Sequence, residues 1–282
     1  MLILKVTGFK KIKMNNVKVI GNIDLSETLW RFMSLDKFID LLETRSLFFS
    51  SLNNFNQTDP YEGYLPKNYN NRMLAQVEQY AESLLGQSGV SEIRKYYPFG
   101  FNFFKTPAIN CWHENNFESD AMWRLYSDQG KGVAIKTTAE RLIKSVLDTS
   151  EKVNYGKVTY LDFESEEDEN QKVSDIMPGL YKRFSFHHER ERRLFIYNNP
   201  FESVSKKIPL ESQDILNLMS GGIEFKNNKI KVDLDTLIHE VIVSPFVNEP
   251  FGSSVKAICN KYGFKDKVVF SKLLNQYELF NF

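Results

Sequence analysis

Short apolar segments in the first third of the chain change between a period of two and a period of three to four residues. Residues 29–33 predict a strand, and Ser34 is placed to cap a helix whose apolar positions 35, 38, 39 and 42 share one face. Residues 46–50 predict a second strand. The segment 53–63 is rich in Asn, Asp, Pro and Gly, which interrupt both regular structures, so we expect a loop there.

Strand-like and helix-like segments continue to alternate through the rest of the chain. Further strands are expected at residues 108–113, 133–136, 155–160, 189–197, 237–243 and 267–270. Further helices are expected at residues 69–97, at 122–126 with Ser119 as the cap, and at 138–147, 175–187 and 250–262.

No internal repeat or long flexible linker divides these segments, so we expect one domain spanning residues 1–282. Residues 64–104 are predicted to be a helical insertion, and residues 1–13 to be peripheral. Many connections are too irregular for a doubly wound design. The sequence therefore predicts an α+β fold with a mixed or antiparallel sheet.

Composition limits the classes of function. Among 282 residues, 36 are Lys or Arg and 36 are Asp or Glu, so the chain lacks the basic excess of a protein that coats nucleic acid. The 23 Phe and 13 Tyr can fill a core and still line a pocket. The acidic segment 162–169 is expected to be a solvated loop, with a partner-binding segment as the alternative.

Cysteine and histidine usage points away from a disulfide framework and from a metal site. Cys111 and Cys259 are the two cysteines, and the four histidines are scattered without a zinc-binding spacing, so we predict no structural metal. No run of 18 apolar residues exists, and the N-terminus lacks the pattern of a signal peptide. A cytoplasmic protein that makes no membrane contact is the expectation.

Four short motifs together resemble a bacterial family. They are Trp30-Arg31 on the first strand, Asp59-Pro60-Tyr61-Glu62 in the loop, Met122-Trp123 followed by Tyr126, and Glu189-Arg190-Glu191-Arg192-Arg193. This combination resembles the DUF2971 family over residues 29–272. The family name assigns no function.

A second, more distant resemblance does imply one. An arginine on the first strand before a short helix, an aromatic-rich middle strand and a late strand with paired glutamates are similar to the ADP-ribosyltransferase superfamily, in particular its DNA-targeting toxin branch. The resemblance implies a split sheet with flanking helices and NAD as the substrate. It also implies an acceptor for the ADP-ribose, which would be a nucleic acid or a protein, in a toxin or phage-defence effector.

The chemistry of NAD cleavage selects candidate residues for this site. Breaking the bond between nicotinamide and ribose passes through an oxocarbenium-like transition state, which a carboxylate stabilises. On a strand, Glu189 and Glu191 would share one face roughly 7 Å apart. Glu191 is the catalytic candidate and Glu189 would lie at the rim. Arg31 would grip the pyrophosphate with two parallel hydrogen bonds.

The same residues also have structural interpretations. Glu189 and Arg193 would otherwise form an exposed ion pair, and Arg31 would be a buried partner of Glu62 or Glu191.

Flat rings and polar groups are needed for the nicotinamide and the adenine. The candidate ligand-contacting residues are Phe55, Trp112, His113, Ser119, Trp123 and Tyr126. Most rings in a chain so rich in Phe belong to the core, and His113 in a strand is more often satisfied locally. The loop 53–63 would fold over NAD as a lid or remain a polar surface loop.

Two other classes of function stay open. A metal-independent ribonuclease-type toxin would use His188, Glu191 and Arg193 around a phosphate, and a non-catalytic binding module of a defence system, with a partner protein, would need none of them. NAD binding separates the ADP-ribosyltransferase hypothesis from both of these alternatives.

Basic residues near the Glu189–Arg193 motif would bind either a nucleic acid or an acidic protein segment. They are Lys182, Arg183, Arg190, Arg192 and Arg193.

Overall fold

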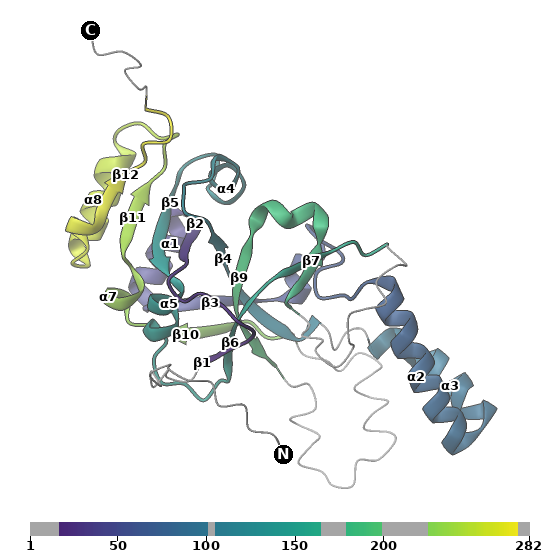
Figure 1. Cartoon of the computed structure of the whole chain (residues 1–282). Coiled ribbons are helices and arrows are strands. Elements are labelled where there is room, and N and C mark those ends of the chain that lie inside the picture. Colours follow the sequence, from purple (N-terminus) through teal and green to yellow (C-terminus); the bar gives the residue numbers. More distant parts are fainter. Residues whose placement is uncertain (1–16, 101–104, 165–178, 199–224, 276–282) are drawn as a thin grey trace.

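A computed structural model describes residues 17–100, 105–164, 179–198 and 225–275 of the chain. Its centre is a ten-stranded mixed sheet (Figure 1). The strands of this sheet are β1 (Val17–Val19), β2 (Thr28–Ser34), β3 (Ser46–Ser51), β4 (Pro107–Glu114), β5 (Gly132–Thr138), β6 (Val153–Lys157), β9 (Glu191–Tyr197), β10 (Asn228–Lys231), β11 (Glu240–Val243) and β12 (Val268–Phe270). A separate parallel pair consists of β7 (Thr159–Leu161) and β8 (Tyr181–Arg183).

The sheet divides along one edge of β4. Its main path runs β1-β6-β9-β4-β2-β5-β11-β12, whereas β3 and β10 form a branch. One end of β4 pairs with β2 at Trp30–His113, and the other end pairs with β3 at Ser50–Ile109. Pairing is antiparallel except for β1–β6 and β11–β12. The expected α+β fold with a mixed sheet and flanking helices is therefore confirmed.

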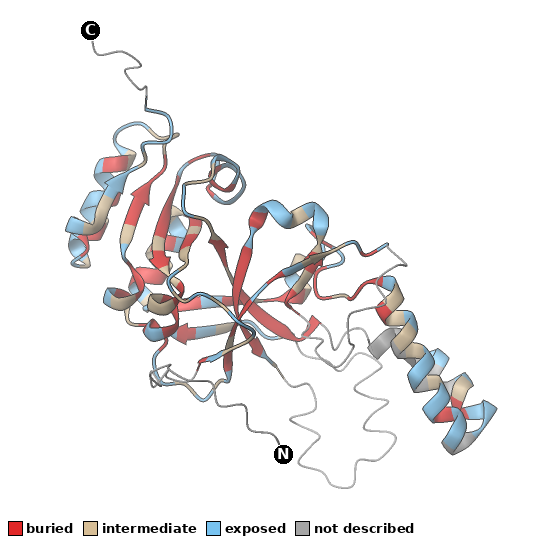
Figure 2. Cartoon of the chain, viewed as in Figure 1, coloured by how far each residue is buried: buried red, intermediate tan, exposed pale blue. Residues whose placement is uncertain are grey.

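Strand alternation separates a large core from a smaller one. On β2, Leu29 and Met33 enter the large core, whereas Trp30 and Phe32 enter the smaller cluster on the opposite face. The helices that cover the large core are α1 (Leu35–Thr44), α5 (Ala139–Ser145), α7 (Leu234–Leu237) and α8 (Phe251–Lys261). Figure 2 shows that buried residues follow the strands and the inner sides of these helices.

The second face of the sheet carries less regular cover. Helix α4 (Asp120–Tyr126) packs Trp123 edge-on against Phe32, with ring centroids 4.9 Å apart. The Ser119 hydroxyl accepts a hydrogen bond from the Met122 amide, so the predicted cap of this helix is confirmed. Farther along the same face, Leu52 of the 3₁₀ helix η1 (Leu52–Phe55) packs with Ile109, Leu180 and Phe195.

Helices α2 (Lys67–Leu85) and α3 (Gln87–Gly100) form a pair that projects away from the sheet (Figure 1). The expected helical character of this region is confirmed, although Gly86 divides it into two helices. Its interpretation as an insertion stays a prediction. Within the described residues, no helix is both long and apolar enough to cross a membrane.

Several predicted boundaries are wrong, each for a physical reason. The strand expected at 189–197 begins only at Glu191, because Arg190 has a left-handed φ of 43° that interrupts an extended chain. Glu189 instead ends the 3₁₀ helix η4 (Phe184–Glu189). Residues 181–183, expected to be helical, form β8 because β7 offers a pairing partner that a local pattern cannot reveal.

Other differences are smaller. The strand expected at 155–160 is divided between β6 and β7, and Asp233 caps a short helix where the strand 237–243 was expected to begin. Ser34 precedes α1 without a side-chain cap hydrogen bond. Both cysteines are free thiols, as expected. Residues 1–13, and the parts 101–104, 165–169 and 175–178 of three predicted segments, lie outside the described residues.

Candidate functional site

Five charged side chains are buried together on the second face of the sheet, between the Trp123 and Leu52 regions. They come from the loop before α2, from β8, from η4 and from β9. We call them the charged cluster: Glu62, Lys182, Glu189, Glu191 and Arg193. The cluster contains three carboxylates and two cations, so its charges do not balance when every group is ionised.

Arg193 is the centre of the cluster, and none of its side chain is exposed. Its Nε donates to Oε2 of Glu191 at 2.7 Å, and its Nη1 donates to Oε1 of Glu62 at 2.8 Å. A third acceptor is the carbonyl oxygen of Gly179 at 2.6 Å. The guanidinium is thus fully used by protein acceptors, as a buried charge requires.

Lys182 joins the two glutamates that the sequence singled out. Its Nζ donates to Oε1 of Glu191 at 2.7 Å and also to Oε2 of Glu189. Glu62 Oε2 lies 3.5 Å from the same nitrogen. The predicted proximity of Glu189 and Glu191 is therefore present, although one residue lies on η4 and the other on β9.

Strand pairing explains why these side chains meet. Arg193 lies opposite Cys111, and Glu191 lies opposite His113, in the antiparallel pair β4–β9. Alternation sends all four side chains to the same face of the sheet. His113 is buried, and its Nδ1 lies 2.7 Å from the carbonyl oxygen of Glu189, so the imidazole ties η4 to β4.

Two tyrosines complete the surroundings of the carboxylates. The Tyr126 hydroxyl, at the end of α4, donates to Oε1 of Glu189 at 2.9 Å. Tyr126 is 42% exposed, so it links Glu189 to the surface. The Tyr160 hydroxyl of β7 accepts a hydrogen bond from the Glu191 amide at 2.8 Å.

The environment drives the pKa values of the two glutamates apart. Burial, together with the neighbouring Glu191 carboxylate, raises the pKa of Glu189 to about 7. Burial also acts to raise the pKa of Glu191, but Arg193 and Lys182 outweigh it and hold that pKa well below its usual range. Near neutral pH, Glu191 is therefore ionised and Glu189 exchanges a proton. Such a separation is typical of acid–base pairs in enzymes.

The raised pKa of Glu189 predicts a pH dependence of stability. Between about pH 5 and pH 7 the folded chain holds a proton on Glu189 that the unfolded chain, with the ordinary value of 4.5, has released. Raising the pH through this window removes that stabilisation, by roughly 2–3 kcal/mol. Glu189→Gln lacks this titration. We therefore expect the free energy of unfolding of the variant, minus that of the wild type, to be larger at pH 8 than at pH 5. Urea denaturation at both pH values measures this difference, and an equal difference at both would contradict the assigned titration.

Arg31 does not join the charged cluster. Its side chain lies on the opposite face of β2 from Trp30 and Phe32, with the guanidinium carbon 5.7 Å from the centroid of the Trp112 ring. Burial lowers its pKa to about 10, so it stays cationic at neutral pH. Glu62 and Glu191 pair with Lys182 and Arg193, so neither of the carboxylate partners suggested for Arg31 is its partner.

The backbone of Arg31 is nevertheless close to the cluster. Strands β2 and β9 flank β4, so roughly 10 Å separates their chains. Arg31 thus lies where the sheet divides, one strand away from the carboxylate pair.

The other predicted ligand-contacting residues occupy different positions. Trp112 and Trp123 are buried, and their indole nitrogens donate to Asn110 and Glu118 respectively. Ser119 caps α4, and Phe55 packs against the Leu52 region. Among the predicted ring contacts, Tyr126 is the one that both touches a cluster carboxylate and is exposed.

The loop 53–63 is anchored to the rest of the fold by two of its acidic side chains. Asp59 is buried, and its Oδ1 accepts hydrogen bonds from Arg183 at 2.7 and 3.1 Å. Glu62 is 2% exposed and reaches into the charged cluster. The Asp-Pro-Tyr-Glu motif therefore supplies two buried acids. Two contacts of the cluster were not predicted from the sequence: the pair between Glu62 and Arg193, and the position of Lys182 between the two glutamates. Both depend on segments that are distant in the chain and meet only in the folded protein.

The described residues contain no group of three or more His, Cys, Asp or Glu side chains positioned to hold a metal ion. The model of a family described as "Protein of unknown function (DUF2971)" matches residues 122–194. The chain resembles DUF2971 over this stretch. The DUF2971 match includes Tyr126, Lys182 and the Glu189–Arg193 motif, but it is shorter than the expected 29–272. No curated protein and no solved structure matches the chain.

Proposed function

We propose that the chain is an ADP-ribosyltransferase-type enzyme, which cleaves the bond between nicotinamide and ribose in NAD and transfers the ADP-ribose. One observation carries the proposal: Glu189 and Glu191 share the ammonium group of Lys182, at a point where Tyr126 connects Glu189 to the surface. Two carboxylates with separated pKa values are the groups that glycosidic cleavage requires.

The ionised Glu191 has the role of stabilising positive charge on the ribose. As the bond from C1′ to the nicotinamide nitrogen breaks, its electron pair leaves with nicotinamide, and an oxocarbenium-like centre develops. Lys182 and Arg193 keep Glu191 ionised at every physiological pH, because they hold its pKa far below neutrality. The negative charge is therefore in place before the reaction, and a ribose that approaches Glu191 has to displace one of the contacts that Lys182 and Arg193 make with its two oxygens.

Glu189 has the role of general base. An acceptor hydroxyl that bonds to C1′ must lose its proton, and a carboxylate with a pKa of about 7 is well matched to receive it near neutral pH. Tyr126 donates to this carboxylate, so substrate entry requires the tyrosine to rotate away. Arg31 has no role in this mechanism, because its side chain lies over Trp112 on the opposite face of the sheet from the two carboxylates.

The geometry gives less support to the ribonuclease-type alternative. Arg193 would have to bind a phosphate, but it is fully buried and its donors already serve Glu191, Glu62 and Gly179. His188 belongs to η4, and within the described part of the chain it forms no hydrogen bond with the charged cluster. A non-catalytic binding module would leave the separation of the two glutamate pKa values without a use.

The pH dependence of NAD cleavage tests the role of Glu189. We expect the wild-type rate of nicotinamide release to fall as the pH drops below about 7, because Glu189 becomes protonated and can no longer accept a proton. Glu189→Gln should lower the rate at pH 8 by at least about 100-fold and remove this acidic limb. Chromatography of released nicotinamide provides the rates. An unchanged limb in the folded variant would assign the base to another group.

A further inference from the structure

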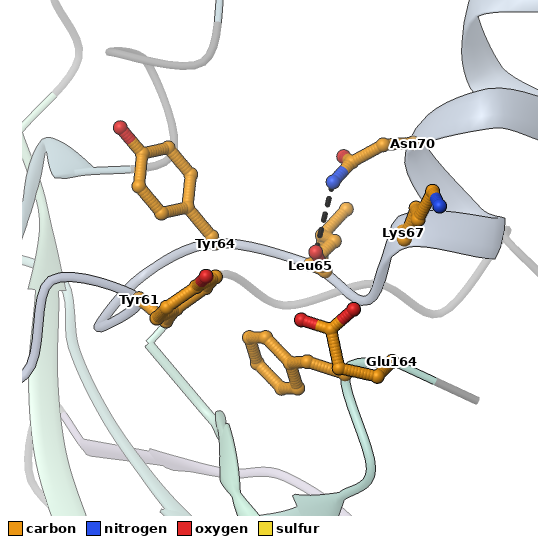
Figure 3. Close-up of a pocket in the computed structure, with 7 residues that line it drawn as sticks. Tyr61, Tyr64, Leu65, Lys67, Asn70 and Glu164 are labelled. Atoms are coloured by element: carbon orange, nitrogen blue, oxygen red, sulfur yellow. Dashed lines mark hydrogen bonds between the residues drawn. The ribbon is translucent and has the colours of Figure 1, made fainter.

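A pocket of about 290 Å³ lies beside the loop that carries Glu62 (Figure 3). Three aromatic rings contribute to its wall, and one acidic and one basic side chain lie among them. The lining residues are Tyr61, Tyr64, Leu65, Lys67, Asn70, Phe163 and Glu164. Nothing in the proposed cleavage mechanism uses these residues.

The rings of this pocket are held in fixed positions. Tyr61 and Phe163 meet edge to face with ring centroids 6.2 Å apart. The Arg183 guanidinium lies over the Tyr61 ring at 4.7 Å, and Asp59 in turn anchors Arg183. Lys105 covers the Tyr64 ring at 4.3 Å. Tyr61 is still 41% exposed, so a ligand can reach its ring without unfolding the site.

The same chain segments build the pocket and the charged cluster. The loop that sends Glu62 to Arg193 provides Tyr61 one residue earlier. Strand β7 sends Tyr160 to Glu191, and the chain then continues to Phe163 at the pocket. In β8, Lys182 binds the two glutamates, whereas the next residue, Arg183, stacks on Tyr61. A ligand in the pocket therefore lies next to the segments that hold the carboxylates.

We propose that this pocket binds a nucleobase. Aromatic side chains are the surfaces on which bases stack, and every base offers a flat face to them. The polar edge of a base also needs hydrogen-bonding groups, which Lys67 and Glu164 provide among the rings. A volume of about 290 Å³ lies at the lower limit for sites that hold drug-sized ligands, so the pocket takes one ring system rather than a whole dinucleotide.

Two sources can supply this base. One is the adenine of NAD, and the other is a base of a single-stranded polynucleotide that accepts the ADP-ribose. The inference rests on the proposed function for both sources, but base binding itself does not require catalysis. Binding and cleavage can therefore be tested separately.

Calorimetry with AMP and with a short single-stranded oligonucleotide tests this proposal. AMP represents the adenine nucleotide of NAD. Binding of the oligonucleotide, with no binding of AMP, would indicate that the base comes from a polynucleotide. Tyr61→Ala should weaken the binding of the recognised probe by at least about tenfold, because it removes a stacking surface. Tyr61→Phe keeps the ring and should change the affinity by less than about threefold. Tyr80→Ala, which alters a 68% exposed tyrosine on α2, is the matched control and should bind like the wild type.

Clear outcomes overturn the proposal. If the wild type binds neither probe, or if a folded Tyr61→Ala, checked by its melting temperature, binds as tightly as the wild type, the pocket is not a base site. Glu189→Gln separates the two proposals, since it should lose NAD cleavage and still bind the base probe. If Glu189→Gln loses cleavage but Tyr61→Ala leaves binding intact, the nucleobase site fails and the proposed function stands.

Discussion

Replacing Arg193 with methionine is expected to lower the free energy of unfolding by about 3–5 kcal/mol, the usual effect of removing one partner of a buried ion pair. The guanidinium is fully buried and is bound by Glu62 and Glu191. Methionine fills a similar volume but leaves three carboxylates in the charged cluster facing only Lys182. The unbalanced charge, rather than a cavity, produces the loss.

A surface ion pair supplies the control for this variant. Lys229 bonds Asp40 at 2.9 Å, and both side chains are 46% exposed. Lys229→Met should therefore change the free energy of unfolding by less than about 1 kcal/mol, because solvent screens an exposed pair. Urea denaturation of both variants at neutral pH gives the comparison. Equal effects of the two substitutions would show that the cluster is not electrostatically coupled as the contacts imply.

Replacing Glu191 with glutamine is expected to abolish NAD cleavage while leaving the chain folded. The amide keeps the shape of the side chain but removes the negative charge that opposes the oxocarbenium centre, so the rate should fall by at least about 100-fold. Folding survives because Arg193 keeps Glu62 and the Gly179 carbonyl, and Lys182 keeps Glu189. With Glu191 neutral, the remaining two carboxylates balance the two cations.

The control for Glu191→Gln is a carboxylate of similar chemistry outside the cluster. Glu140 forms an exposed pair with Lys144 on α5, and Glu140→Gln should retain the wild-type rate. Circular dichroism and the melting temperature verify that both variants are folded. Wild-type cleavage by a folded Glu191→Gln would remove this residue from the mechanism.

Much of the fold could be predicted from local sequence patterns. The strands β2, β3 and β4 and the helices α1 and α8 appear where the sequence pattern placed them, because the strands are short, strongly apolar segments bounded by polar residues and each helix buries one face. The three-residue strands β1 and β8 were not predicted, since they depend on pairing with β6 and β7. The end of the strand near Glu189 was also misplaced, because alternating charges on either side of a left-handed residue imitate strand periodicity.

The candidate site was predictable only in part. The motif drew attention to Glu189 and Glu191, and the structure does bring their carboxylates to one lysine. The motif could not reveal that Arg193 binds Glu62, which lies some 130 residues earlier in the chain. Arg31 lies on the opposite face of β2 from Trp30 and Phe32, as strand alternation predicts, but its contact with Trp112 there was not predicted. Such relations depend on tertiary pairing, which one sequence does not encode locally.

Release of nicotinamide from NAD decides whether the Glu189–Glu191 pair performs glycosidic cleavage. The purified chain is incubated with NAD at pH 8, with water and then a cell lysate as acceptor, and nicotinamide is detected by mass spectrometry. We expect release by the wild type and by Glu140→Gln, and at most about one hundredth of that rate from Glu191→Gln. Absence of release by the folded wild type with both acceptors, or equal release by Glu191→Gln, would contradict the assignment of the Glu189–Glu191 pair to glycosidic cleavage.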